Sequence, residues 1–401
     1  MNKGFIALVL FLIFLAFFKV YSCIPPEEGF YKTKDEGAYF GYSVYLSERG
    51  FGRYGDIVSG YFADKDKWSG PFPFRIGYVF LTAMVFKVFG PSYRAMAGIS
   101  FACYILLVGV SFYFIRKNFG DFFAAGCALL LAFSPLQMAM ARRALTDSPG
   151  CLLVVLSFWL FMSFITKGCR GPDLAKFIFS YAAAMLVKEQ FLLLLPLFVL
   201  LALAGKYKYG AALKPAHLAA IAVLPLVISL TAWYLTAGWH YLSAACGIAM
   251  NVRQVAQYAQ YFCRGPWPTF MIDYLLISPV VAFLGLAFFC YKLIGRSWLD
   301  DSRIFCLIVA AAWIYLAFSG IDGFKNVRYV LALDVFLRIF VLLALDKLLD
   351  GQRLKRFYIF SAVLVLVCMD YFNFDYLFRE VNIYDPVSFM LLKARLMIPA
   401  G

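Results

Sequence analysis

Long apolar runs separated by short charged segments dominate this chain. A transmembrane helix needs roughly 20 predominantly apolar residues, and many of the runs approach that length. They predict about eleven membrane spans, near residues 4–22, 95–115, 122–140, 150–166, 174–187, 190–205, 216–237, 268–292, 304–319, 329–349 and 357–370. The pattern therefore predicts an all-α polytopic membrane protein.

Segment 74–89 is apolar but short, and it carries Arg75 and Lys87 at its ends. Counting it as a span would reverse the side of every later loop. Basic residues concentrate in short cytoplasmic loops, and this rule is satisfied when 74–89 lies on the outer surface. We therefore predict an interfacial helix there, with loops 23–94, 141–149 and 320–328 facing outward.

The chain shows no linker and no low-complexity tract. We predict a single transmembrane domain over residues 1–401, in which 23–94 forms a first outer loop with interfacial helices. The apolar run after Lys3 resembles a signal peptide but has no cleavage-site pattern, so it is interpreted as an uncleaved helix. The segment after the last span, 371–401, is too short for a soluble C-terminal domain.

Composition narrows the choice of partners. The 401 residues are 63% hydrophobic and 15% charged, with a net charge of +14, whereas soluble domains are about 45–50% apolar and 25% charged. The basic residues lie at helix ends and in loops, which favours membrane lipids or phosphate ligands over nucleic acid.

The metal-ligating and thiol residues are sparse. Only two histidines occur, His217 and His240, so a zinc site is not expected. We predict no cofactor, and a divalent cation bound by the acidic residues is the less favoured alternative. Cys246 and Cys263 share one predicted outer loop, and their pairing stays open because spacing does not determine geometry.

Asp35 and Glu36 form an acidic pair soon after the first apolar run. Paired carboxylates near a membrane surface can accept a proton from an incoming hydroxyl or bind a divalent cation. The alternative interpretation is a pair of solvated loop charges.

Arg142 and Arg143 lie where the third run meets the predicted outer surface. Arginine suits bidentate binding of phosphate, although these side chains can also extend toward lipid phosphates. Asp147 precedes Ser148 and Pro149, which is an ordinary helix start. We interpret Asp147 as mainly structural, capping that helix and orienting an arginine.

Two further basic sites lie on the same predicted face. Lys188 is a candidate point-charge phosphate ligand, or else forms a pair with Glu189 that only closes a turn. Arg328 and Tyr329 open the tenth run, where free N–H groups favour an anion. The alternative there is an interfacial aromatic beside an arginine that extends to the membrane surface.

At these positions the chain resembles the polyprenyl-phosphate-sugar glycosyltransferases. The resemblance rests on Asp35-Glu36, on Phe86-Lys87-Val88-Phe89-Gly90, on Ser134-Pro135, and on the stretch from Arg142 to Pro149. That family includes the dolichyl-phosphate-mannose protein mannosyltransferases and the bacterial aminoarabinose transferases of lipid A. The likeness is greatest over residues 70–165.

The resemblance implies a GT-C fold with its active site on the extracytoplasmic face, in a bacterial plasma (inner) membrane. It implies a sugar donor on a polyprenyl monophosphate, an acceptor that is a glycan, a lipid or a protein, and inversion at the anomeric carbon. Asp35 would be the base, with Glu36 assisting. The donor phosphate would be held by Arg142, Arg143, Lys188, Arg328 and Tyr329.

Two features depart from the family pattern. Larger members carry a soluble outer domain after the last span, and Lys188 precedes Glu-Gln where relatives often have Gly. Two other functions remain open. One is a transporter or flippase for a lipid-linked sugar, which predicts charges near the bilayer midplane and broken helices. The other is a partner-dependent subunit without catalysis of its own.

Overall fold

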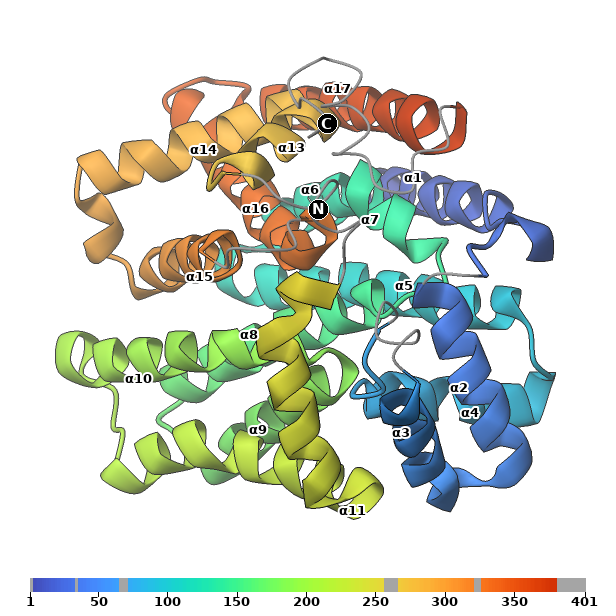
Figure 1. The fold of residues 1–401 in the computed structure, drawn as a ribbon. Helices are drawn as coiled ribbons and strands as arrows, with labels where there is room; N and C mark the ends of the chain where they lie inside the picture. Colours follow the sequence, from blue (N-terminus) through green and yellow to red (C-terminus); the bar gives the residue numbers. More distant parts are fainter. Residues whose placement is uncertain (1–2, 33–34, 65–70, 256–265, 321–325, 381–401) are drawn as a thin grey trace. The chain divides into compact units, whose positions relative to one another are not determined.

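The computed structural model of the protein describes residues 3–32, 35–64, 71–255, 266–320 and 326–380, and of these only the backbone over 245–255. Within these ranges every regular element is a helix (Figure 1). The all-α prediction is therefore confirmed. Whether Cys246 and Cys263 pair, which the sequence leaves open, concerns residues outside the described side chains.

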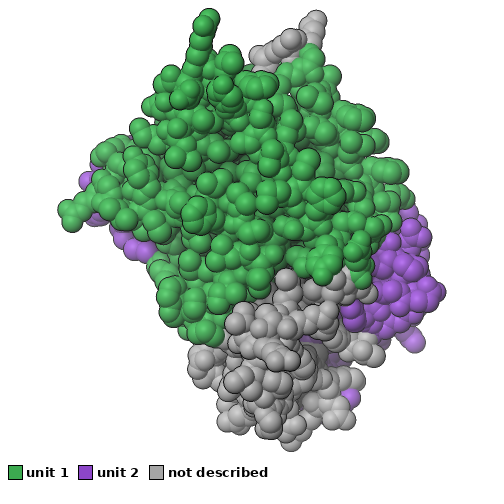
Figure 2. Space-filling model, turned by 90° about the horizontal axis from the view of Figure 1, so that it is seen from above, with its two compact units in different colours: residues 1–23, 103–141, 263–401 green, residues 24–102, 142–262 purple. Residues whose placement is uncertain are grey.

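Spatial contacts between residues divide the chain into two compact units, which have different colours in Figure 2. Unit 1 comprises residues 1–23, 103–141 and 263–401, and unit 2 comprises residues 24–102 and 142–262. The long helix α5 (Tyr93–Phe119) begins in unit 2 and continues into unit 1.

Unit 2 contains the first outer loop and the middle of the chain. The loop folds into short helices, of which α2 packs on α4, while α8 packs on α9 and α9 on α11. Its helices are η1 (Glu27–Gly29), α2 (Asp35–Arg49), η2 (Phe51–Arg53), α3 (Tyr54–Ala63), α4 (Ile76–Phe89), α8 (Asp147–Thr166), α9 (Gly171–Val187), η4 (Glu189–Leu194), α10 (Leu195–Tyr209) and α11 (Pro215–Val255).

Unit 1 combines the N-terminal helix with two later groups of helices. Helix α16 is central to it, because α6, α14, α15 and α17 all pack against it. Its helices are α1 (Lys3–Ser22), α6 (Asp121–Ala132), α7 (Pro135–Ala141), α13 (Thr269–Ile277), α14 (Pro279–Ile294), η5 (Ser297–Leu299), α15 (Ser302–Ser319), η6 (Val327–Val330), α16 (Leu331–Leu348), α17 (Lys355–Phe374) and η7 (Asp375–Glu380).

Seven helices in the described part of the chain have the length and apolar composition of a membrane span, or eight if a bent pair counts as one. The protein is thus an integral membrane protein, and the count of eleven spans stays a prediction. Helix α4 has 14 residues, fewer than the roughly 20 that span a bilayer. That length is consistent with the predicted interfacial helix.

Two predicted spans are broken in the structure. The run 122–140 consists of α6 and α7, bent by 59°, and the run 268–292 consists of α13 and α14, which meet at Ser278. Each break precedes a proline, Pro135 or Pro279. Proline disfavours the helical conformation of the residue before it, so the apolar run continues while the helix does not.

Candidate functional site

The acidic pair opens α2, and its two carboxylates have different surroundings. Asp35 is half-buried in the first turn. Glu36 is fully buried, with 0% of its surface exposed. A buried carboxylate requires hydrogen-bond donors or a counter-charge, and Glu36 has both.

Glu36 binds the predicted arginine segment directly. Its Oε2 accepts a hydrogen bond from Arg143 Nη2 at 2.6 Å and another from the Tyr31 backbone N–H at 2.8 Å. Its Oε1 accepts from the Ala144 backbone N–H at 3.0 Å. The first outer loop and the segment after α7 are therefore joined by one side chain.

Two aromatic rings contact the arginine of this ion pair. The Arg143 guanidinium lies over the Tyr31 ring at 4.7 Å and the Phe30 ring at 5.5 Å, and Arg143 is 5% exposed. Such cation–π contacts add to the attraction of the carboxylate when water is excluded. Arg142, the preceding residue, is also buried.

A second buried ion pair joins Lys188 to Asp147. Lys188 Nζ lies 2.6 Å from Asp147 Oδ1, and both side chains are 2% exposed. Asp147 is the first residue of α8, and Lys188 has an extended backbone between α9 and η4. Asp147, interpreted from the sequence as orienting an arginine, thus holds a lysine.

Glu189 has a different partner from its neighbour. Its carboxylate accepts two hydrogen bonds from Arg75, at 3.0 Å from Nε and 3.1 Å from Nη2. Arg75 also donates to the Tyr39 hydroxyl and lies over the Tyr39 ring. The alternative in which Lys188 and Glu189 only pair with each other is therefore wrong.

Sequence reasoning noted Arg75 only as a charge at the end of segment 74–89. In the structure Arg75 is the N-cap residue of α4, and its hydrogen bonds to Tyr39 on α2 and Glu189 on η4 join the start of α4 to both elements. The available signal was an arginine directly after Pro-Phe-Pro-Phe, at a helix start inside an otherwise apolar stretch. Nothing in that spacing identified its partners.

These three ion pairs bring together six of the eight charged side chains of this group in unit 2. The pairs are Glu36–Arg143, Asp147–Lys188 and Glu189–Arg75. Asp35 and Arg142 lie outside these three pairs and directly beside Glu36 and Arg143 in the sequence. We refer to the eight residues as the unit 2 charge cluster.

Glu27 anchors the same loop to the start of α5. Its carboxylate accepts hydrogen bonds from Ser92 Oγ at 2.6 Å, Tyr93 N at 3.0 Å and Arg94 N at 3.1 Å. Burial raises the pKa of Glu27, but these hydrogen bonds outweigh it and hold the pKa below its ordinary value. The carboxylate thus satisfies free N–H groups at a helix N-terminus.

Arg328 and Tyr329 lie in unit 1, on η6. Both are half-buried, and the Arg328 guanidinium lies 5.7 Å from the centre of the Tyr329 ring. The Asn326 side chain accepts a hydrogen bond from the Arg328 backbone N–H at 3.1 Å. The two residues therefore sit at the first turn before α16, as the sequence predicts.

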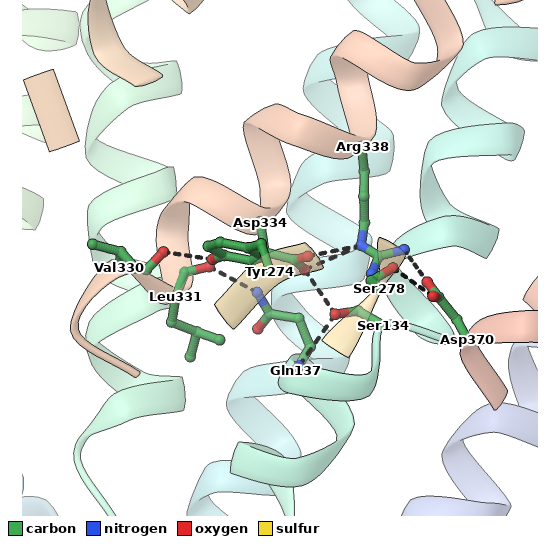
Figure 3. A network of polar contacts seen from close by, with 9 residues as sticks. All are labelled: Ser134, Gln137, Tyr274, Ser278, Val330, Leu331, Asp334, Arg338 and Asp370. Atoms are coloured by element: carbon green, nitrogen blue, oxygen red, sulfur yellow. Dashed lines mark hydrogen bonds and ion pairs between the residues drawn. The ribbon is translucent and has the colours of Figure 1, made fainter. Parts of the chain in front are cut away.

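Three charged residues of unit 1 were not predicted as functional. Asp334 and Arg338 on α16 and Asp370 on α17 form a fully buried ionic network (Figure 3). The i,i+4 spacing of Asp334 and Arg338 inside an apolar run was the available signal. Among the described residues, no three His, Cys, Asp or Glu side chains group as metal ligands would.

The family model of the dolichyl-phosphate-mannose-protein mannosyltransferases matches residues 73–234. This stretch contains Arg142, Arg143, Asp147 and Lys188, and it excludes Asp35 and Arg328. None of the curated proteins matches the chain significantly.

Solved structures similar to the chain include ArnT from Cupriavidus metallidurans. Its apo form is 18% identical with a TM-score of 0.52, over 86% of this chain and 60% of that one. Its form bound to undecaprenyl phosphate is 17% identical with a TM-score of 0.56, over 91% and 64%. The Archaeoglobus fulgidus oligosaccharyltransferase is 12% identical with a TM-score of 0.50, over 75% and 44%.

The fold defines the class of the protein, an all-α membrane protein with the GT-C fold. Within this class, the family model and the ArnT structures confirm the resemblance to the polyprenyl-phosphate-sugar glycosyltransferases. The chain spans about 60% of the length of apo ArnT and 64% of the bound form.

Proposed function

We propose that this protein is a glycosyltransferase that moves a sugar from a polyprenyl monophosphate to a hydroxyl acceptor at the extracytoplasmic face of the membrane. The observation that carries the proposal is the clamp formed by Glu36, which binds Arg143 and Ala144 from 107 and 108 positions away. The acid pair and the arginine segment therefore lie next to each other, as residues that act in the same reaction must.

In the proposed reaction Asp35 is the base. Its carboxylate accepts the proton of the acceptor hydroxyl while the hydroxyl oxygen forms a bond to the anomeric carbon of the donor. The bond between that carbon and the phosphate oxygen breaks with its electron pair, and polyprenyl phosphate leaves. Attack from the face opposite the leaving group inverts the anomeric centre.

Cations contribute most where negative charge develops, which is on the departing phosphate. The candidates predicted from the sequence are Arg142, Arg143 and Lys188 in unit 2, and separately Arg328 and Tyr329 in unit 1. Arg143 and Lys188 each hold a buried carboxylate. We expect these two to act mainly by fixing the segments that carry Arg142 and Asp35, and Glu36 to assist Asp35 in the same way.

The test measures release of polyprenyl phosphate from a panel of polyprenyl-phosphate sugars by purified protein in liposomes. Candidate glycan, lipid and peptide acceptors are included. Asp35→Asn is expected to abolish release while the protein stays folded. Asp56→Asn is the matched control, because Asp56 is an exposed acid of the same loop bonded only to Tyr45 and Arg53 among the contacts described. Full activity of Asp35→Asn would refute the assignment of the base.

A transporter or flippase of a lipid-linked sugar is the second candidate. The bent pair α6–α7 and the buried charges of α16 and α17 favour it, because broken helices and intramembrane charges are features of transporters. The same liposomes separate the two functions. Passage of a labelled lipid-linked sugar across the bilayer with the sugar still attached would support transport.

A further inference from the structure

The buried ionic network of unit 1 surrounds one guanidinium (Figure 3). Arg338 Nε donates to both carboxylate oxygens of Asp334 at 3.1 Å, and Arg338 Nη1 donates to Asp370 at 2.8 Å. Arg338 is 0% exposed, and both aspartates are almost fully buried. Buried ionic groups of this kind are often no more stabilising than apolar residues of the same volume. Stability alone therefore does not account for them.

The network also binds the two helix breaks of unit 1. Ser134, at the break between α6 and α7, donates to Asp334 at 2.7 Å. Ser278, at the break between α13 and α14, donates to Asp370. A break frees backbone groups from the helical pattern and leaves the direction of the next segment undetermined. The two serine–carboxylate hydrogen bonds fix these directions.

One side chain from each broken helix donates a hydrogen bond to a carbonyl at the start of α16. Gln137 on α7 donates from Nε2 to the Leu331 carbonyl at 3.1 Å. Tyr274 on α13 donates from its hydroxyl to the Val330 carbonyl at 2.9 Å. Figure 3 shows both hydrogen bonds. Val330 and Leu331 follow Arg328 and Tyr329 in the sequence, so these bonds hold the backbone next to the predicted phosphate ligands.

We propose that Asp334, Arg338 and Asp370, acting through Gln137 and Tyr274, form a positioning network that fixes Arg328 and Tyr329 for binding of a polyprenyl phosphate. This inference rests on the proposed function, because it concerns the donor of that reaction. Preorganised ligands bind an anion more tightly, since less ordering remains to be done upon binding. The network residues themselves do not touch the phosphate.

The test compares binding of undecaprenyl phosphate with binding of undecaprenol to the protein in nanodiscs. The ratio of the two affinities isolates recognition of the phosphate, because the lipid chain is the same. Substituting Asp334, Arg338 or Asp370 risks misfolding. The test variant therefore removes only the hydrogen bonds to the Val330 and Leu331 carbonyls, by the double change Tyr274→Phe with Gln137→Met. Tyr54→Phe is the matched control, since it removes another buried hydroxyl that donates to a carbonyl, that of Pro73.

The double variant is expected to lower the phosphate-over-alcohol ratio at least tenfold, and Tyr54→Phe to leave it unchanged. A general loss of structure would lower both affinities. In a background that carries both Arg328→Gln and Tyr329→Phe, the double change is expected to lower the ratio no further, because the network acts through these two residues. An unchanged ratio in the wild-type background, or an equal loss in the background without the two phosphate ligands, would overturn the inference.

The same experiment separates this inference from the proposed function. A wild-type protein that binds undecaprenol as tightly as undecaprenyl phosphate would refute the proposed donor, and the positioning role would fail with it. A wild-type preference for the phosphate that survives in the double variant would refute the positioning role alone.

Discussion

The ion pair between Glu36 and Arg143 allows a quantitative prediction. In Glu36→Gln, one amide oxygen can still accept from Ala144 N, but the amide NH2 group then faces the donors Arg143 Nη2 and Tyr31 N. Arg143 then loses the charge of Glu36 while it remains buried. Removing one partner of a buried ion pair lowers the free energy of unfolding by about 3–5 kcal/mol, and we expect this loss.

The matching variant removes the cation. In Arg143→Met the Glu36 carboxylate keeps its two backbone donors but loses its counter-charge, so a loss of about 3–5 kcal/mol is expected here too. In the double variant both charges of this pair are gone. We therefore expect it to be less destabilised than the sum of the single variants by at least about 2 kcal/mol, since residues in contact couple by 0.5–3 kcal/mol.

The measurement is the free energy of unfolding in bicelles, obtained by steric trapping for wild type, both single variants and the double variant. The same cycle on the exposed pair Arg303–Asp301 is the control, and it should couple by less than about 1 kcal/mol. If the double variant lost the full sum of the single losses, the two side chains would be energetically independent and the clamp would not exist.

Two further predictions concern the first outer loop. Glu27→Gln should lower the free energy of unfolding by about 0.5–1 kcal/mol at pH 7. The pKa of Glu27 is depressed from 4.5, so its carboxylate stabilises the fold above that pH, and this stabilisation is lost as pH falls through the lower folded value. Thermal unfolding should show the difference from wild type shrink as the pH falls over this range, and a difference that does not depend on pH would contradict the role of the charge. Gly37→Ala places a Cβ 1.6 Å from the Lys32 carbonyl oxygen, whereas a Cβ at Gly41 of the same helix meets nothing within 4 Å. Gly37→Ala should therefore lower the free energy of unfolding by about 1–3 kcal/mol or more, and Gly41→Ala should not. Equal stability of the two variants would disprove the close approach.

Helix positions follow from the sequence because apolar runs of spanning length have few alternatives in a membrane. The run 304–319, for example, corresponds to α15 at Ser302–Ser319. The breaks at Ser134 and Ser278 were missed because apolar character is continuous through them. Hydropathy records what a side chain prefers as solvent, whereas the prolines that follow act on backbone conformation.

The pairing of charges is the part that sequence reasoning did not supply. Lys188 lies beside Glu189 in the chain, yet its ion pair is with Asp147, 41 positions earlier. Local spacing cannot identify such a partner, because the choice depends on which helices pack together. The acid pair and the arginines were found from their residue types alone, since charge is rare in this chain.

The distance along the chain between Glu36 and Arg143, 107 positions, also has a meaning for biosynthesis. At about 5–20 residues per second, Arg143 is made roughly 5–20 s after Glu36. During that interval α5, α6 and α7 are synthesised, and the carboxylate of Glu36 must remain hydrated. The first outer loop can therefore reach its final position only after these hydrophobic segments have left the ribosome. The ion pair thus forces the loop to assemble later than the helices that follow it in the sequence.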